Sequence, residues 1–184
     1  ISYLMGGHVF VSGTEVTPSG KRISIIRDDS VIMQALEDSG QKWVSLQKTS
    51  QTIATLIFEG KSIQQTLTGI DLTHSGMIKE RLALVDGNWE NLSWSNAIII
   101  SQSIAKKLNV LPGDVLVAQL QTITGQNNVG EFRVAAITID SSFVGSIMTY
   151  VQLEYLNSLI GLGKNEYMSL GIMLERLEKS GPFD

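Results

Sequence analysis

The 24 residues from Ala97 to Leu120 restrict the possible fold more than any other stretch of the chain. They begin with the aliphatic run Ala97 to Ile100, which is typical of a buried strand. The apolar spacing from Ser103 to Leu108 predicts a helix, and a Pro-Gly turn follows it. Val115 to Leu120 then predicts a second strand. These elements together predict a compact, β-rich unit with one or two helices.

The remaining residues also divide into short elements. Thr, Ile, Val, Leu and Phe dominate from Trp43 to Ile70, which predicts a hairpin that turns at Glu59 to Ser62. Residues 28–30 carry side-chain oxygens that predict the start of a short helix, and Gly40 is placed to end it. Further elements are expected as strands at His8 to Val11, Glu131 to Ile139, Ile147 to Val151 and Met168 to Leu174, and as helices around Met77 to Ala83 and Gln152 to Leu162. The predicted fold class is therefore α+β.

The ends of the sequence favour a piece of a larger protein. The chain starts without Met and without the basic, apolar pattern of a secretion signal. Its longest aliphatic run, Ala97 to Ile100, is far shorter than the ~18 apolar residues that span a bilayer. The 184 residues are enough for one sizeable domain or two small ones. The lack of Cys excludes disulfides and thiolate chemistry, and it fits an extracytoplasmic and a cytosolic protein equally.

Three observations argue against a phosphate-bearing ligand. Gly60-Lys61-Ser62 resembles the lysine end of a phosphate-binding loop, but Thr55 stands where that loop needs its first glycine. Because the residues after Ser62 favour a strand, the dipole of a following helix is missing too. The net charge of −4, with only two adjacent basic pairs, also argues against nucleic acid. We interpret the stretch as a hairpin turn with a solvated lysine.

Catalytic and metal-binding patterns fail on their spacing. Asp71, His74 and Ser75 lie close in sequence, but neighbours in one turn are rarely oriented as a triad, so a turn that caps the next helix is favoured. Gly161 to Glu166 lacks the third glycine of a dinucleotide fingerprint and follows a helix, so it is interpreted as a helix stop. Asp86 to Asn91 matches a calcium loop only in its first three residues. We expect no catalytic residue, no cofactor and no metal.

Three aromatic residues are candidates for contact with a partner protein. Trp89 and Trp94 lie in a polar, glycine-containing loop, where an indole ring either anchors the core or contacts a partner. Phe143 lies between predicted elements and could be an exposed hydrophobic residue. Packing in the core or loop is the favoured interpretation for all three, and partner contact is the alternative.

The ordered set of motifs resembles the periplasmic core domain of ABC transporter permeases of the MacB, FtsX and lipoprotein-releasing (LolC and LolE) superfamily. The most telling motif is a helix that ends in Leu-Asn-Val and meets a Pro-Gly-Asp turn between two strands. The stretches that carry the resemblance cover most of the chain and are "GGHVFVSG", "LTGID", "RLALVDGNW", "AIIISQSIAKKLNVLPGDVLV", "EFRVAAI" and "IMTYVQLEYLNSLIGL". No single stretch is specific, so the case depends on their order and spacing.

This resemblance implies a two-part architecture outside the inner membrane. It implies a porter-like subdomain built from both chain ends, residues 1–69 and 140–184, with a smaller β-rich, Sabre-like subdomain, residues 70–139, inserted between them. Such a domain lies between the first and second of four transmembrane helices, so its ends would point back to the membrane. The change in composition near Gly69 to Leu72 agrees with the first border.

The resemblance also implies a mechanical role in place of an enzymatic one. ATP would be bound by a separate cytoplasmic ATPase subunit or domain, and two permease subunits would form a homodimer or heterodimer. The domain would couple ATP-driven motion to lipoprotein release or substrate export, with a periplasmic carrier or adaptor protein as a further partner.

Two other functions remain open from the sequence. The first is a secreted ligand-binding or adhesion domain without catalysis. The second is a hydrolase that uses Asp71 and His74. Apolar spans of ~20 residues on both sides of the chain in the full gene would favour the permease.

Overall fold

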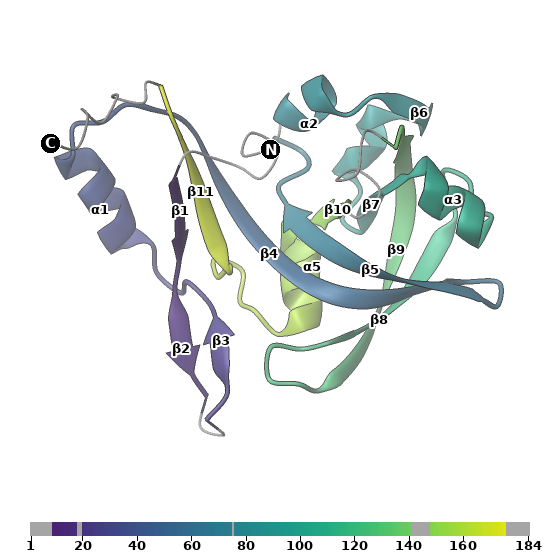
Figure 1. The fold of residues 1–184 in the computed structure, drawn as a ribbon, viewed down its shortest axis with the longest axis horizontal. Helices are drawn as coiled ribbons and strands as arrows, with labels where there is room; N and C mark the ends of the chain where they lie inside the picture. The colour runs from purple at the N-terminus through teal and green to yellow at the C-terminus, as the bar shows by residue number, and fades with distance from the viewer. Residues whose placement is uncertain (1–8, 18–19, 75, 141–147, 176–184) are drawn as a thin grey trace, which may run out of the picture.

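The computed structural model describes residues 9–17, 20–74, 76–140 and 148–175 and has two lobes (Figure 1). The mixture of helices and strands confirms the α+β class. We define the small lobe as the described residues up to 49 together with 164–175, and the large lobe as those from 50 to 163. In chain order the elements are β1 (Val9–Ser12), β2 (Thr14–Val16), β3 (Arg22–Ser24), α1 (Ser30–Asp38), β4 (Trp43–Phe58), β5 (Lys61–Ile70), α2 (Gly76–Arg81), β6 (Leu84–Gly87), the 3-10 helix η1 (Trp89–Ser93), β7 (Ala97–Ser101), α3 (Gln102–Leu108), β8 (Val115–Gln121), β9 (Asn127–Thr138), β10 (Met148–Gln152), α5 (Leu153–Ile160) and β11 (Ser169–Leu174).

The small lobe is built on an antiparallel sheet in the order β1-β11-β4, with α1 beside it and the β2-β3 hairpin below (Figure 1). Its core is a cluster of four buried residues, Ile26, Tyr167, Leu170 and Ile172, against which α1 packs Ile32 and Leu36. Val9 pairs with Ile172, so the two ends of the described chain lie side by side at one edge of this lobe.

The large lobe closes six strands into a ring. β4 pairs with β5, β5 with β10, β10 with β7, β7 with β9, β9 with β8, and β8 again with β4. The main hydrophobic cluster takes buried side chains from every strand of the ring and from α3 and α5, among them Leu56, Leu67, Ile98, Leu116, Phe132, Val151 and Leu156. In this closed ring each of the six strands has a paired neighbour on both sides, which favours a stiff body.

Helix α5 lies against the ring because two strand glycines leave room for it. A Cβ atom on Gly69 would lie 2.9 Å from Leu156 Cδ2, and one on Gly130 would lie 2.4 Å from Leu159 Cδ1. Asn128 Nδ2 donates a 2.7 Å hydrogen bond to the Leu159 carbonyl, which ties the end of the helix to β9. These contacts fix the position of α5, which leads directly to the junction with the small lobe.

Most of the predicted elements are confirmed. Glu59 and Gly60, with φ of 45° and 77°, form the two-residue turn of the β4-β5 hairpin, so Lys61 begins a strand and not a phosphate-binding helix. α3 ends at Leu108, as predicted, and the structure shows Asn109 after it in the left-handed conformation. Gly161 has φ of 83° at the end of α5, which confirms the helix stop.

Three elements differ from the sequence predictions. The residues from Val85 to Trp94 were expected to be a loop, yet β6 pairs there with β9 and η1 follows. β9 begins at Asn127, four residues before the predicted Glu131, because the polar residues at its start pair with β8. The β2-β3 hairpin was not predicted, because each of its strands has only three residues, too few for a clear alternating pattern.

The predicted subdomain borders, after Gly69 and before Asp140, both fall inside the large lobe. In the same lobe β10, from the last predicted segment, lies between β5 and β7. The division into two subdomains stays a prediction, which we take up below. No helix in the described part of the chain has both the length and the apolar character to cross a bilayer.

Candidate functional site: the junction between the lobes

Two chain segments connect the lobes, and one of them is the long strand β4. β4 pairs with β11 up to Thr49 and with β5 from Ser50 onward. On the side of β4 where the pairing with β11 ends, β8 begins to pair only at Ala54. In the gap between these two partners, the N–H group of Gln51 donates to the sulfur of Met168 at 3.3 Å. Bending between the lobes would therefore break the fewest strand hydrogen bonds here.

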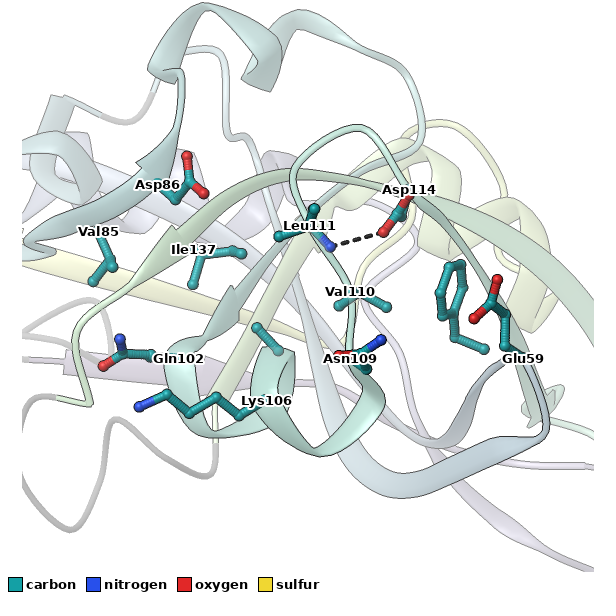
Figure 2. Close-up of a pocket in the computed structure, with 12 residues that line it drawn as sticks. Glu59, Val85, Asp86, Gln102, Lys106, Asn109, Val110, Leu111, Asp114 and Ile137 are labelled. Carbon is teal, nitrogen blue, oxygen red and sulfur yellow. Dashed lines mark hydrogen bonds between the residues drawn. The ribbon is translucent and has the colours of Figure 1, made fainter.

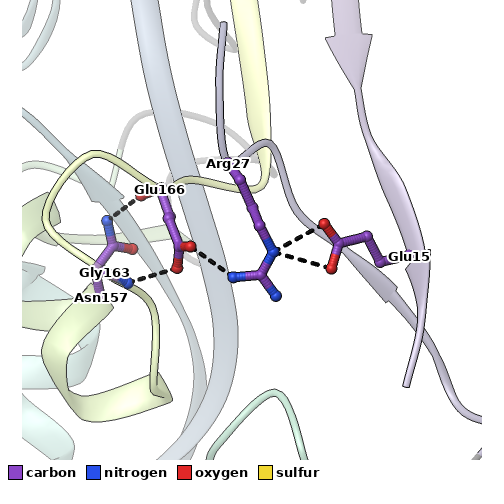
Figure 3. Close-up of polar contacts among 5 residues, drawn as sticks. All are labelled: Glu15, Arg27, Asn157, Gly163 and Glu166. Atoms are coloured by element: carbon purple, nitrogen blue, oxygen red, sulfur yellow. Dashed lines mark hydrogen bonds and ion pairs between the residues drawn. The ribbon is translucent and has the colours of Figure 1, made fainter. Parts of the chain in front are cut away.

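The second segment, between α5 and β11, is held by a chain of charge-assisted hydrogen bonds that we call the Arg27 clamp (Figure 3). Arg27 Nε lies 2.8 and 3.0 Å from the two carboxylate oxygens of Glu15 on β2, and its Nη1 lies 2.5 Å from Glu166 Oε1. The N–H group of Gly163 donates to Glu166 Oε2 at 2.7 Å, and Asn157 Nδ2 donates to the Glu166 carbonyl at 2.8 Å. Asn157 is buried on α5, so the clamp links a hairpin of the small lobe to a helix of the large one.

Arg27 and Glu166 in the clamp both stay charged at neutral pH. The N–H group of Gly163 and then the Arg27 guanidinium hold the pKa of Glu166 below its usual range, against an opposing effect of burial. Hydrogen bonds from Glu15 and Glu166 raise the pKa of Arg27. The side chains of Arg27 and Glu15 are 51% and 42% exposed, so solvent screens the pair and its main effect is to fix geometry.

A second polar network lies beside the clamp. Lys48 Nζ lies 2.8 Å from Asp29 Oδ2, and the Tyr167 hydroxyl donates to the same oxygen at 2.9 Å. The Lys48 ammonium also lies 4.8 Å from the centre of the Tyr167 ring. Hydrogen bonds from Lys48 and then Tyr167 lower the pKa of Asp29, while burial and this carboxylate raise the pKa of Tyr167. The network joins the start of α1, β4 and the segment that precedes β11.

A cleft of about 1120 Å³ opens between the lobes. One wall comes from β4, at residues 45–48, and the other from α5 and its following loop, including Tyr155. Lys48, on the first wall, and Glu166 and Tyr167, on the second, also belong to the two polar networks. A change in the width of the cleft would therefore act directly on the residues that set the orientation of the lobes.

Trp89 and Trp94 do not line the cleft between the lobes. Trp89 and Trp94 are half-buried and pack against the hydrophobic cluster below η1, and Arg133 lies 5.3 Å from the Trp94 ring centre. Phe143 lies outside the described residues. The packing agrees with a role as loop anchors, and partner contact by these residues stays a prediction.

The turn expected at Asp71 is confirmed. Asp71 Oδ1 accepts hydrogen bonds from the N–H groups of Thr73 and His74, at 3.1 and 3.0 Å. His74 Nδ1 lies 2.9 Å from Asp71 Oδ2, and its side chain is 82% exposed. Burial opposes the ionisation of Asp71, but hydrogen bonds from His74 leave its pKa lowered. Ser75 lies outside the described residues, so the structure brings together two of the three residues.

Sequence reasoning missed the residues of the clamp. Glu15 and Glu166 lie 12 and 139 positions from Arg27, so no local spacing connects them. Glu166 was noticed only as a residue that breaks a glycine pattern. A signal exists in its own loop, because a carboxylate three residues after Gly163 can accept that glycine's N–H group.

Comparisons with known proteins find this fold among transporter domains. The extracellular domain of the noncanonic ABC-type transporter YknZ from Gram-positive bacteria matches with a TM-score of 0.55 and 22% identity, over 80% of this chain and 73% of that one. The periplasmic region of MacB from Actinobacillus actinomycetemcomitans matches with a TM-score of 0.52 and 19% identity, over 81% and 67%. No family model and no curated protein matches the sequence. The comparisons thus confirm a fold shared with extracytoplasmic domains of ABC-type transporters, whereas the porter-like and Sabre-like subdivision stays a prediction.

Proposed function

We propose that this chain is the extracytoplasmic domain of an ABC transporter permease in a bacterial inner membrane. The observation that carries the proposal is the fold shared with the domains of YknZ and MacB over four fifths of the chain. The sequence motifs that resemble this superfamily support it independently.

The position of the chain ends supports attachment to a membrane. Because Val9 and Ile172 are paired neighbours, both ends of the described chain leave the small lobe together. A domain inserted between two transmembrane helices needs this arrangement. The small lobe would then face the membrane, and the tip of the β4-β5 hairpin would lie at the other end of the molecule (Figure 1).

We further propose that the two lobes are the porter-like and Sabre-like subdomains. The small lobe is built from both parts of the chain that flank the large lobe. Its sheet has a hydrophobic cluster of its own, while Ile23 and Ile25 of this lobe join the main cluster. The cores favour borders near Thr49 and Gly163 over the sequence-based borders at Gly69 and Asp140. Limited proteolysis should cut first near residues 51–53 or 163–165; first cuts near Gly69 would contradict this division.

In the proposed mechanism the domain transmits motion and carries out no reaction. A separate cytoplasmic ATPase would hydrolyse ATP, and the membrane part would move this domain relative to that of a second permease subunit. The clamp and the closed ring of strands make the domain stiff enough to pass that displacement to a periplasmic carrier or adaptor protein. The outcome would be lipoprotein release or substrate export.

The location is tested by labelling from outside the cell. These 184 residues contain no Cys, so Val31→Cys, at a position 77% exposed on α1, introduces a single thiol into a full-length protein from which any other Cys has been replaced. A maleimide that cannot cross the inner membrane should label this thiol in spheroplasts as fully as after lysis. Labelling only after lysis would overturn the proposal.

A further inference from the structure

Figure 2 shows the lining of a second cavity, of about 510 Å³. The β4-β5 hairpin tip, β6 and α3, which surround it, lie at the end of the large lobe opposite the small lobe (Figure 1). We call this cavity the end pocket. It is bounded by the tip of the β4-β5 hairpin at Glu59, by β6 at Asp86, by α3 and by the loop from Leu111 to Asp114. The residues of the Arg27 clamp and of the cleft between the lobes do not line it.

The end pocket has an excess of negative charge. Three carboxylates, Glu59, Asp86 and Asp114, face one ammonium, Lys106, so the formal charge of its lining is −3 + 1 = −2. Asp86 Oδ1 accepts the N–H group of Gly87 and Asp114 Oδ2 that of Leu111, both at 2.7 Å. The second oxygen of each, and both oxygens of Glu59, have no hydrogen-bond partner among the described residues. These oxygens can accept hydrogen bonds from a cationic ligand.

The spacing of these carboxylates suits an extended ligand better than a single ion. They come from three different elements and stand around the rim of the pocket (Figure 2). Within the part of the chain that the structure describes, no group of three or more acidic or histidine side chains is close enough to hold a metal ion.

Apolar side chains complete the surface of the pocket. Leu111 is 66% exposed and Val85 is 43% exposed, above the nearly buried Ile137. Gln102 at the start of α3 and Asn109 just after its end add side-chain amides that have no hydrogen-bond partner among the described residues. Free amides can pair with the polar backbone of an extended peptide, while the exposed leucine can cover an apolar side chain.

We propose that the end pocket binds a short segment of a partner protein that carries a Lys or Arg next to a large apolar side chain. The charge selects the basic residue, and Leu111 and Val85 select its apolar neighbour. The inference rests on the proposed function in one respect, since that function orients this end of the molecule away from the membrane, where a partner can reach it.

The test uses the isolated 184-residue chain and two synthetic tetrapeptides, blocked at both ends, of alternating leucine with lysine or alternating leucine with glutamate. In ¹⁵N NMR titrations the lysine peptide should shift the amide signals of α3, β6 and the hairpin tip. The glutamate peptide should bind at least tenfold more weakly. Equal binding of the two peptides, or shifts confined to other surfaces, would overturn the proposal.

Matched variants test which side chains of the end pocket contribute to binding of the lysine peptide. Replacing Glu59→Gln and Asp86→Asn should weaken binding of the lysine peptide by about fivefold for each charge removed, since an exposed ion pair contributes up to ~1 kcal/mol. Leu111→Ser should weaken binding of the lysine peptide about fourfold for each methylene group of Leu111 that the bound peptide would have buried. The control, Glu37→Gln with Asp38→Asn, makes the same change in charge on exposed positions of α1 in the small lobe. An equal loss of binding in this control would overturn the proposal.

This test is independent of the permease proposal. Peptide binding is measured without membrane or ATPase, so a failure here leaves the labelling result at Val31 unaffected. Conversely, labelling only after lysis would remove the proposed orientation but would leave a measured preference for the basic peptide in place.

Discussion

At the scale of single residues, Arg27 holds the junction between the lobes. Its guanidinium joins a carboxylate 12 positions before it to one 139 positions after it, using the planar geometry that suits carboxylates. Neither pairing can be predicted from local sequence, because the partners lie far apart along the chain and no local spacing connects them. The structure is needed to show that these surfaces meet.

Removal of Arg27 should loosen the junction without unfolding either lobe. In the Arg27→Gln variant, the distribution of distances between spin labels at Val31 and Val129, two exposed positions in different lobes, should become broader. Arg22→Gln, on the neighbouring strand β3, removes the same charge at an exposed position that has no ion pair among the described residues, and serves as the control. Unchanged widths in Arg27→Gln, measured by pulsed EPR, would contradict a role for the clamp.

Acid should weaken the fold through Asp29 and Glu166. Their pKa values in the folded chain lie below the ordinary values of 3.8 and 4.5, so each contributes stability that is present above those values and lost as the pH falls through the folded pKa. The urea midpoint should be nearly constant from pH 7 to 5 and fall as the pH drops below 4.5. Asp29→Asn with Glu166→Gln should flatten that fall, whereas Glu37→Gln with Asp38→Asn should not.

At the scale of elements, local patterns predict what depends on local chemistry. The turn at Glu59-Gly60, the helix ends at Gly40, Asn109 and Gly161, and the aliphatic strand β7 all follow from residue type and spacing. β6 could not be predicted, because its four residues have no clear alternation and become a strand only by pairing with β9. The closure of the ring through β8 and β4 likewise depends on pairing across more than 50 positions.

The pairing of β6 can be tested with two glycines that both have positive φ. An alanine Cβ at Gly87, with φ of 90°, would lie 2.5 Å from the carbonyl oxygen of Ala135 on β9, whereas at Gly60, with φ of 77°, it would meet no atom within 4 Å. We expect Gly60→Ala to lower the free energy of unfolding by about 1–2 kcal/mol. Gly87→Ala should cost a further ~1–3 kcal/mol because of the steric clash. Equal losses in urea unfolding would contradict the close contact of β6 with β9.

The position of α3 can be tested with two nearby leucines. Leu108 is 1% exposed in the core of the large lobe, and Leu111 is 66% exposed. Leu108→Ala should lower the free energy of unfolding by about 2–5 kcal/mol because it leaves a cavity. Leu111→Ala should change it by less than about 0.5 kcal/mol. Similar effects of the two substitutions on thermal unfolding would contradict this placement of the helix.

At the scale of the whole molecule, the arrangement agrees with a body that passes on a displacement. The paired ends leave the small lobe together, β4 runs through both lobes, and the clamp joins them a second time at α5. The order of motifs in the sequence predicts the fold because the resemblance spans most of the chain. It does not locate the junction, where the charged residues Glu15, Arg27 and Glu166 belong to no shared motif, or the end pocket, whose lining comes from separate elements.

The most direct test of the central claim is a distance measured in the assembled transporter. Spin labels would be placed at Val129 of this chain and at the corresponding position of the second permease subunit, and pulsed EPR would compare the nucleotide-free state with an ATP-bound state. The account predicts that the distance between the two labels changes when ATP binds. Identical distance distributions in the two states would contradict the claim that this domain transmits ATP-driven motion.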